Sequence, residues 1–286
     1  METIAATSLF DVLPRTAQTG PDGRLAVGGC ALAEIAAEFG TPALVFDEQG
    51  LRDTAREYRA AFAARHHDTD VHFASKALPC APVLRVLAEE GLGCDVASAG
   101  ELAIALAGGF DAEDIVLHGN AKSDQDIGDA VRAGVGLVVI DNADDVDRLE
   151  RIGAEQRVLI RINPAVPGLT HAAIDTGSAS SKFGVPLDQA PALIDRVAAI
   201  PGLELLGLHV HIGSQLLDLG GFARAADAHA GLGELVVMPA TGACCYSLMS
   251  NYNGARRPNV VLARDGDARL AVRREEMTDL LARDML

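Results

Sequence analysis

Apolar and polar positions alternate with a regular spacing along the middle of the chain. Short β-rich runs begin near Val71, Cys94, Ile115, Leu137 and Val158, at intervals of 23, 21, 22 and 21 residues. Apolar residues at helical spacing fill most of each interval. A strand and a helix every ~20 residues predict a parallel sheet built from βα repeats. The predicted helices cover 82–90, 99–107, 123–133 and 142–152, and each is followed by a glycine.

Five near-identical steps favour a (β/α) barrel over a doubly wound sheet. The Gly-x-Gly-x-x-Gly fingerprint of dinucleotide-binding folds is absent after the first strand, which agrees with this choice. A sixth strand is predicted at 205–211, after a long loop at 163–184 that is rich in Gly, Ser, Thr and Ala. Before the repeats, the sequence predicts a short helix at 31–39, a strand at 41–47 and a helix from 48 to about 65.

Composition narrows the function classes. The net charge of −16 argues against a general nucleic-acid partner, because neutralising phosphates requires a basic face. The five cysteines form no Cys-x-x-Cys pair, which favours a reducing, cytoplasmic environment over a disulfide framework. No signal-peptide pattern is visible at 1–13, and no apolar run approaches the roughly 18–20 residues of a membrane helix.

Titratable residues stand where the predicted strands end. Lys76 ends the first strand in a chain that has three lysines and twenty-one arginines. A desolvated lysine amine can attack a carbonyl to form a Schiff base, which an arginine cannot do, although Lys76 could also be an ordinary charged residue. Barrel active sites lie at the C-terminal ends of the strands. We therefore expect the following strand ends to converge there: Lys76, Asp95, His118, Asp141, Arg161 and His209 to Ser214.

Seven stretches of the sequence carry a family resemblance by their joint order and spacing. They resemble motifs of the fold-type III pyridoxal-phosphate-dependent decarboxylases, and within that family those of the diaminopimelate decarboxylases. The resemblance covers the chain from about residue 24 to its C-terminus. The matching stretches are 73–77 (Phe-Ala-Ser-Lys-Ala), 93–102, 118–123, 182–184, 207–215, 239–243 and 246–253.

The resemblance implies an enzyme that uses pyridoxal 5'-phosphate to convert meso-diaminopimelate into L-lysine and CO₂, in lysine biosynthesis. It implies a small amino-acid substrate, a homodimer and catalytic roles for Lys76 and His211. Lys76 would hold the cofactor covalently, and His211 would stack on its ring. Ser214, with the backbone of Gly213, would bind the phosphate. The residues that would line the cofactor are Ala74, Asp95 and Arg161.

The chain also departs from the family pattern. A complete (β/α)₈ barrel takes about 250 residues, whereas 160 residues separate the first predicted strand from the end of the sixth repeat near Ala230. The predicted fold is therefore α/β, an incomplete TIM-type barrel with six of eight strands, plus the remnant of a C-terminal β-domain. We expect a lead-in and β-domain strand at 1–47, a partial cofactor-binding barrel at 48–232, and the rest of the β-domain at 233–286.

Three family motifs are missing from the sequence. They are the glycine run that wraps the phosphate, the Glu-Pro-Gly-Arg segment and the Cys-Glu-Ser-Gly-Asp segment. Cys244 stands where the family usually has a tyrosine that contacts cofactor and substrate. These departures leave a second function open, that of a catalytically impaired remnant that at most binds pyridoxal phosphate.

The His-x-His pair permits a third interpretation. His209 and His211 share one face of a strand and could bind a divalent metal in a hydrolase barrel. No carboxylate stands nearby as an obvious third ligand, and the following Gly-Ser suits a phosphate better, so we expect no metal. Lys122 and Lys182 are interpreted as loop or helix-start residues.

Overall fold

The structure is a computed structural model that describes residues 13–164, 182–211, 236–237 and 256–282. These residues divide into two compact units. The first unit contains 13–69, 80–91 and 256–282, and the second contains 70–79, 92–164, 182–211 and 236–237. The first unit contains two three-stranded sheets and the second unit one larger sheet, and each unit is described separately below.

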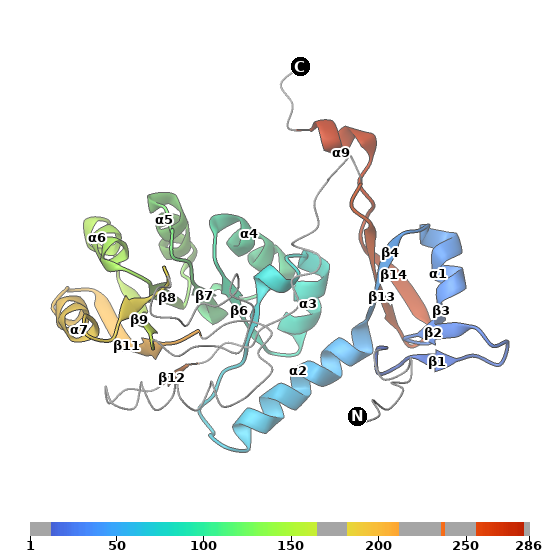
Figure 1. The fold of residues 1–286 in the computed structure, drawn as a ribbon, viewed down its shortest axis with the longest axis horizontal. Coiled ribbons are helices and arrows are strands. Elements are labelled where there is room, and N and C mark those ends of the chain that lie inside the picture. The colour runs from blue at the N-terminus through green and yellow to red at the C-terminus, as the bar shows by residue number, and fades with distance from the viewer. Residues whose placement is uncertain (1–12, 165–181, 212–235, 238–255, 283–286) are drawn as a thin grey trace, which may run out of the picture. The chain divides into compact units, whose positions relative to one another are not determined.

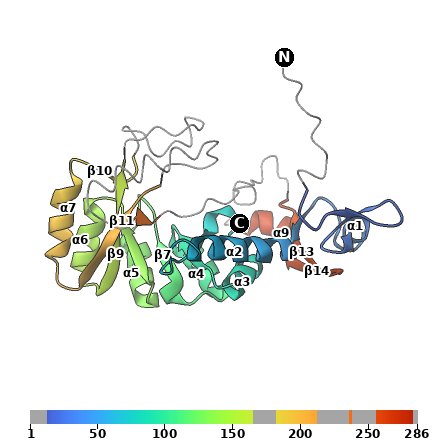
Figure 2. The ribbon, with the colours of Figure 1, turned by 90° about the horizontal axis from the view of Figure 1, so that it is seen from below.

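The second unit is built on one parallel sheet whose strands follow each other in chain order. Four helices lie along one face of this sheet (Figure 1 and Figure 2). Its strands are β5 (His72–Ala74), β6 (Gly93–Val96), β7 (Ile115–Leu117), β8 (Leu137–Ile140), β9 (Gln156–Asn163), β11 (Leu203–His209) and β12 (Val236–Val237), with β10 (Val185–Pro186) pairing beside β9. The helices are α4 (Ala99–Gly108), α5 (Asp124–Ala133), α6 (Ala143–Arg151) and α7 (Ala190–Ala198).

The predicted incomplete (β/α) barrel is confirmed, and all six predicted strands are present. The strands are mostly apolar, and β7 and β8 are largely buried on both faces, as in other parallel sheets. Val138 and Ile140 on β8 are fully buried, as are Val158 and Ile160 on β9.

Local signals set the helix boundaries in this unit. Ser123 caps α5 through a capping box with Asp126, and Asn142 caps α6 by accepting the backbone N–H of Asp145. Gly134 ends α5 with a φ of 77°, a left-handed conformation that glycine adopts without strain. Helix α4 runs one residue further than predicted, because Gly109 rather than Gly108 takes the left-handed C-cap.

One short strand differs from the sequence-based expectation. The sequence predicts that the stretch beginning at residue 233 belongs to the β-domain, but Val236 and Val237 pair in parallel with Leu208 and His209 of β11. The two valines therefore extend the barrel sheet by a seventh position. An apolar run of this length predicts a strand without indicating which sheet it joins. Residues 238–255 lie outside the described parts, so the position of the domain boundary stays a prediction.

The first unit combines segments from the N-terminal and C-terminal parts of the sequence. Strand β4 (Ala43–Asp47) pairs in parallel with β13 (Asn259–Arg264), which forms a hairpin with β14 (Asp267–Val272). Asp265 and Gly266 turn this hairpin with φ values of 52° and 83°, the signature of a type I′ turn. The other elements are β1 (Gln18–Thr19), β2 (Leu25–Val27), β3 (Cys30–Ala31), α1 (Leu32–Phe39), α2 (Glu48–Ala63), α3 (Ala81–Glu89) and α9 (Met277–Leu281).

A buried ion network ties α2 to α3 and β14 within this unit. The Arg52 guanidinium donates to Glu48, Glu89 and Glu90, and Arg269 of β14 donates to Glu48. Arg52, Glu48 and Glu90 are each exposed by less than a tenth. Among the described helices of the chain, none is long and apolar enough to cross a membrane.

Candidate active site

The candidate site lies where the parallel strands of the second unit end. Strand β5 ends at Ala74, and a single 3₁₀ turn, η2 (Ser75–Ala77), follows it. Ala74 and Ser75 are buried, whereas Lys76 is exposed on this turn. Asp95 on β6 is the register partner of Ala74, so it occupies the equivalent level of the next strand. The first two strands therefore bring an exposed amine and a carboxylate to one rim.

Asp95 meets a histidine from the following strand end. Its Oδ2 lies 3.6 Å from Nε2 of His118, and both side chains are about 15% exposed. Burial raises the pKa of Asp95 to about 6, and the positive charge of Lys76 opposes this rise. Burial lowers the pKa of His118 to about 3, helped by the charge of Arg161. At neutral pH this contact therefore joins a carboxylate to an uncharged imidazole.

Two further histidines come from the end of β11. His209 is buried, and its ring meets the ring of His118 edge-on, with 4.6 Å between centroids and 64° between planes. Burial lowers the pKa of His211 to about 3, and the charges of Lys76 and Arg161 lower it further. His211 is therefore an uncharged flat ring at neutral pH, close enough to Lys76 to sense its charge.

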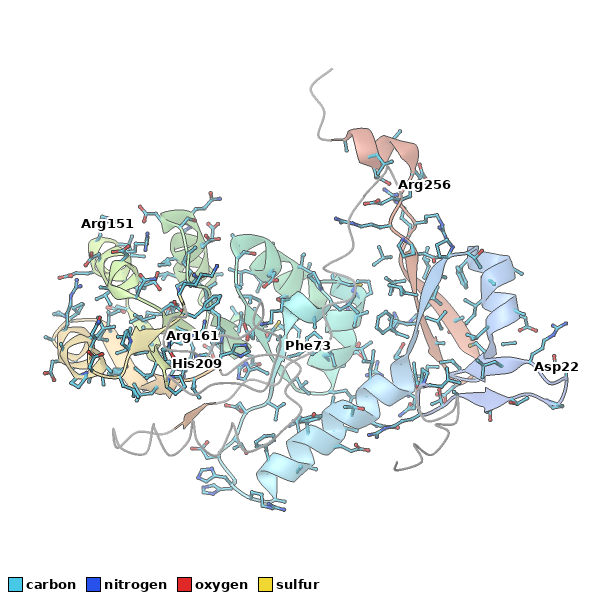
Figure 3. The ribbon with its side chains drawn as sticks, in the orientation of Figure 1. Asp22, Phe73, Arg151, Arg161, His209 and Arg256 are labelled. Atoms are coloured by element: carbon cyan, nitrogen blue, oxygen red, sulfur yellow. The ribbon has the colours of Figure 1, made fainter. Side chains whose placement is uncertain are left out.

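Arg161 supplies a buried positive charge from β9. Its Nη1 donates to Oδ1 of Asp141 at 3.1 Å, and its guanidinium lies 4.6 Å from the centre of the Phe183 ring. Burial lowers the pKa of Arg161, while Asp141 acts in the opposite direction. Figure 3 shows Arg161 and His209 beside each other in the sheet, with Phe73 marking β5.

Five of the eight residues expected at the site fall within the described structure: Ala74, Lys76, Asp95, Arg161 and His211. All five lie at or just beyond strand ends of the same sheet, and the charges of Lys76 and Arg161 act on both Asp95 and His211. Their roles stay predictions. Gly213, Ser214 and Cys244 lie outside the described residues.

The sequence interpretation missed Lys122. The sequence predicts a loop or helix-start residue, and Lys122 does precede the N-cap of α5, but its side chain is completely buried. Its ammonium lies 2.7 Å from Oδ2 of Asp145. The scarcity of lysine in this arginine-rich chain was the available signal, since it applies to Lys122 as much as to Lys76. Lys182 is exposed, with its ammonium 5.2 Å from the centre of the Phe183 ring.

The metal interpretation of the His-x-His pair gains no support. Within the described ranges, no group of three or more His, Cys, Asp or Glu side chains could hold a metal ion. His209 packs against His118 rather than beside a set of acidic ligands.

Comparison with known proteins assigns the chain to a family. Residues 49–242 match the model of the pyridoxal-binding domain of pyridoxal-dependent decarboxylases. A diaminopimelate decarboxylase of Actinosynnema pretiosum is 45% identical over 213 residues, which are 73% of this chain and 48% of that protein. One of Mycobacterium leprae is 42% identical over 228 residues, 78% of this chain and 48% of that protein. The chain thus spans about half the length of these curated relatives.

Solved structures agree on the fold. The crystal structure of diaminopimelate decarboxylase from M. jannaschii in complex with L-lysine aligns with a TM-score of 0.81 at 21% identity, over 96% of this chain and 98% of that chain. This likeness supports the architecture alone. Because the family model covers more than half of the chain, the chain belongs to the pyridoxal-dependent decarboxylases, whose cofactor is pyridoxal 5'-phosphate.

Proposed function

We propose that this chain is a pyridoxal-phosphate-dependent amino-acid decarboxylase that converts meso-diaminopimelate into L-lysine and CO₂. The observation that carries the proposal is the position of Lys76, exposed on the turn after β5 and electrostatically coupled to Asp95 and His211. Because the chain belongs to the pyridoxal-dependent decarboxylases, we interpret Lys76 as the residue that would bind the cofactor.

The residues at this rim fit the cofactor. Lys76 offers an accessible amine for covalent attachment to the aldehyde. His211 offers a flat ring that burial keeps uncharged, so it can pack on the pyridine ring without adding a second charge. Asp95 stands close enough to Lys76 to stabilise a positive charge on the attached nitrogen. The cofactor, when bound, supplies the electron sink for the electron pair left by the loss of CO₂.

Arg161 adds a fixed cation to the same rim. Asp141 orients its guanidinium from one side and the Phe183 ring contacts it from another, so the group is held before any ligand arrives. A buried cation of this kind favours anionic parts of the cofactor or substrate. Gly213 and Ser214 remain our candidates for binding the phosphate, as the resemblance implies.

The names of the relatives support the proposed substrate. Curated relatives at 42–45% identity bear the name diaminopimelate decarboxylase, and a solved relative was crystallised with L-lysine. A role in lysine biosynthesis and assembly as a homodimer belong to the same proposal.

A second function is favoured by one specific observation. The matched part corresponds to only 48% of the Actinosynnema protein. The family's glycine run and its Glu-Pro-Gly-Arg and Cys-Glu-Ser-Gly-Asp segments are missing from the sequence, and Cys244 stands at a tyrosine position. This pattern, in which some cofactor motifs are retained and others are missing, is what we expect of a chain that binds pyridoxal phosphate without turning over an amino acid.

A turnover assay separates the two functions. The purified chain is incubated with pyridoxal phosphate and meso-diaminopimelate, and both L-lysine and CO₂ are quantified. The decarboxylase proposal predicts equal amounts of the two products, and none from a Lys76→Ala variant. Ornithine and arginine serve as competing substrates. If the parent chain binds the cofactor but releases no CO₂ from any of the three amino acids, the decarboxylase proposal fails and the binding function replaces it.

A further inference from the structure

Lys122 and Asp145 form a completely buried ion pair beside the candidate site. Both side chains are 0% exposed, and 2.7 Å separates Nζ of Lys122 from Oδ2 of Asp145. The Lys122 ammonium also donates to the backbone carbonyls of Val139, at 2.9 Å, and Gly119. Three acceptors match the three protons of the ammonium, so its hydrogen bonds are complete.

The three acceptors belong to different parts of the barrel. Gly119 lies just after β7, Val139 lies on β8, and Asp145 lies in the first turn of α6. A second link runs parallel to this one, because Nδ2 of Asn142 donates to the carbonyl of Asn120 at 3.3 Å. Lys122 therefore holds together the turns that leave two adjacent strands.

The same network continues to Arg161. Oδ2 of Asp145 also accepts the backbone N–H of Asp141 at 3.0 Å. The Asp141 carboxylate in turn accepts from Nη1 of Arg161 at 3.1 Å and from the backbone N–H of Gly184 at 3.1 Å. Along this series the two carboxylates, Asp145 and Asp141, lie between the two cations, Lys122 and Arg161. The backbone bond to Asp141 makes the direction of the Asp141 carboxylate depend on the position of Asp145.

We infer that this buried ion pair fixes the positions of the groups around it and adds little to the free energy of folding. Removing two charges from water carries a large desolvation cost, so well-packed apolar residues often stabilise a fold equally well. Here the pair lies between two strand ends that carry candidate site residues. An apolar pair of the same volume would fill the space without fixing the turn at Asp141.

We propose that Lys122 is a positioning residue, which with Asp145 fixes the turn after β8 so that Asp141 directs Arg161 into the cofactor site. The inference rests on the proposed function only for the identity of the ligand. Lys122 itself contacts neither the cofactor nor the substrate and acts through Arg161.

A double-mutant cycle tests this relation. The variants are Lys122→Met, Arg161→Met and the double variant, and the affinity for pyridoxal phosphate is measured by titrating the visible absorbance of the bound cofactor. We expect Lys122→Met and Arg161→Met each to raise the Kd about tenfold, which corresponds to ~1.4 kcal/mol. Because Lys122 acts through Arg161, the double variant should show about the same Kd as Arg161→Met alone.

A matched control removes a buried ion pair elsewhere. Arg52→Met breaks the buried network of the first unit, so it should lower the urea midpoint while changing the Kd less than about twofold. Two results would overturn the inference. One is a Kd for Lys122→Met within twofold of the parent, and the other is a double variant in which the two effects multiply.

A second readout keeps the inference separate from the proposed function. The urea midpoints of the same four proteins are measured without cofactor. If the parent fails to bind pyridoxal phosphate, the proposed function is wrong. The double-mutant cycle calculated from the urea midpoints still tests whether Lys122 and Arg161 are coupled. A double-variant shift clearly smaller than the sum of the single shifts supports the coupling, and additive shifts contradict it.

Discussion

Replacing His118 with glutamine is expected to make the folded protein less sensitive to acid. Burial, with help from nearby positive charges, lowers the pKa of His118 to about 3 from the ordinary value of 6.5. Unfolding exposes the imidazole, which then takes up a proton below pH 6.5. Because the folded-state pKa is depressed, the contribution of His118 to stability is complete above pH 6.5 and declines as the pH falls toward 3.

The magnitude follows from the two pKa values. At pH 5 the unfolded histidine lies 1.5 pH units below its ordinary pKa of 6.5, whereas the folded one remains uncharged. At 1.36 kcal/mol per unit, protonation of the unfolded chain removes about 2 kcal/mol of stability between pH 8 and pH 5. Asp95 acts in the opposite direction, because its raised pKa of about 6 favours the folded state as the pH falls through 6. Its gain over the same interval is about 1.4 kcal/mol.

Urea unfolding of the cofactor-free protein at pH 8 and pH 5, followed by circular dichroism, measures this effect. The free energy of unfolding should fall by about 2 kcal/mol less in His118→Gln than in the parent between the two pH values. His67→Gln, which removes a histidine that is exposed on the first unit, is the matched control. If parent and His118→Gln lose the same free energy between pH 8 and pH 5, then burial does not keep His118 uncharged and the electrostatic description of the site is wrong.

Three further predictions concern parts of the structure that support the site or the fold. Arg52→Met should lower the free energy of unfolding by about 1.5 to 3 kcal/mol, because the buried Glu48 and Glu90 lose charged hydrogen bonds, although Arg269 and Arg56 still pair with them; a change below about 1 kcal/mol in urea unfolding would contradict the buried network. Ser123→Ala should cost about 1 kcal/mol through loss of the α5 capping box, measured as a lower melting temperature, and an unchanged melting temperature would show that the cap contributes nothing. Gly184→Ala places a methyl group 3.1 Å from Cγ of Arg161 at a φ of 72°, so it should cost about 1 kcal/mol and also weaken pyridoxal phosphate binding. Gly134→Ala is the control, because the added methyl group meets no atom within 4 Å although the backbone has a similar φ of 77°. It should show the same backbone strain without weaker cofactor binding, and equal binding by both variants would refute the steric argument.

Much of the barrel could be predicted because local signals and tertiary structure agree there. The strands that begin near 71, 94, 115, 137 and 158 are mostly apolar runs bounded by glycines and helix caps. The near-constant interval between them favours a (β/α) barrel. Ser123 and Gly134 fix the two ends of α5 as their side-chain chemistry requires. The strand β12 could not be assigned in this way, because two valines carry no information about which sheet provides their partner.

The candidate site was predictable only in part. The location of Lys76, Asp95 and Arg161 at one rim could be predicted, because the strand ends of a parallel barrel lie together and topology brings their polar residues close, while their roles stay predictions. Lys122 was missed because it lies beyond its strand end and next to a helix start, where the sequence does not reveal whether a side chain points to solvent or into the core. Its three acceptors come from residues 3, 17 and 23 positions away along the chain, two of them backbone carbonyls that no side-chain pattern reveals.

The most direct test of the account is to find which lysine holds the cofactor. The chain is incubated with pyridoxal phosphate, treated with borohydride to fix the covalent adduct, and digested for mass spectrometry. Only Lys76, Lys122 and Lys182 can carry a side-chain adduct. We predict that the label lies on Lys76, that Lys76→Ala abolishes it, and that Lys182→Ala retains it. A label on Lys182 or Lys122, or no label on the parent chain, would contradict the claim that the end of β5 forms a pyridoxal phosphate site.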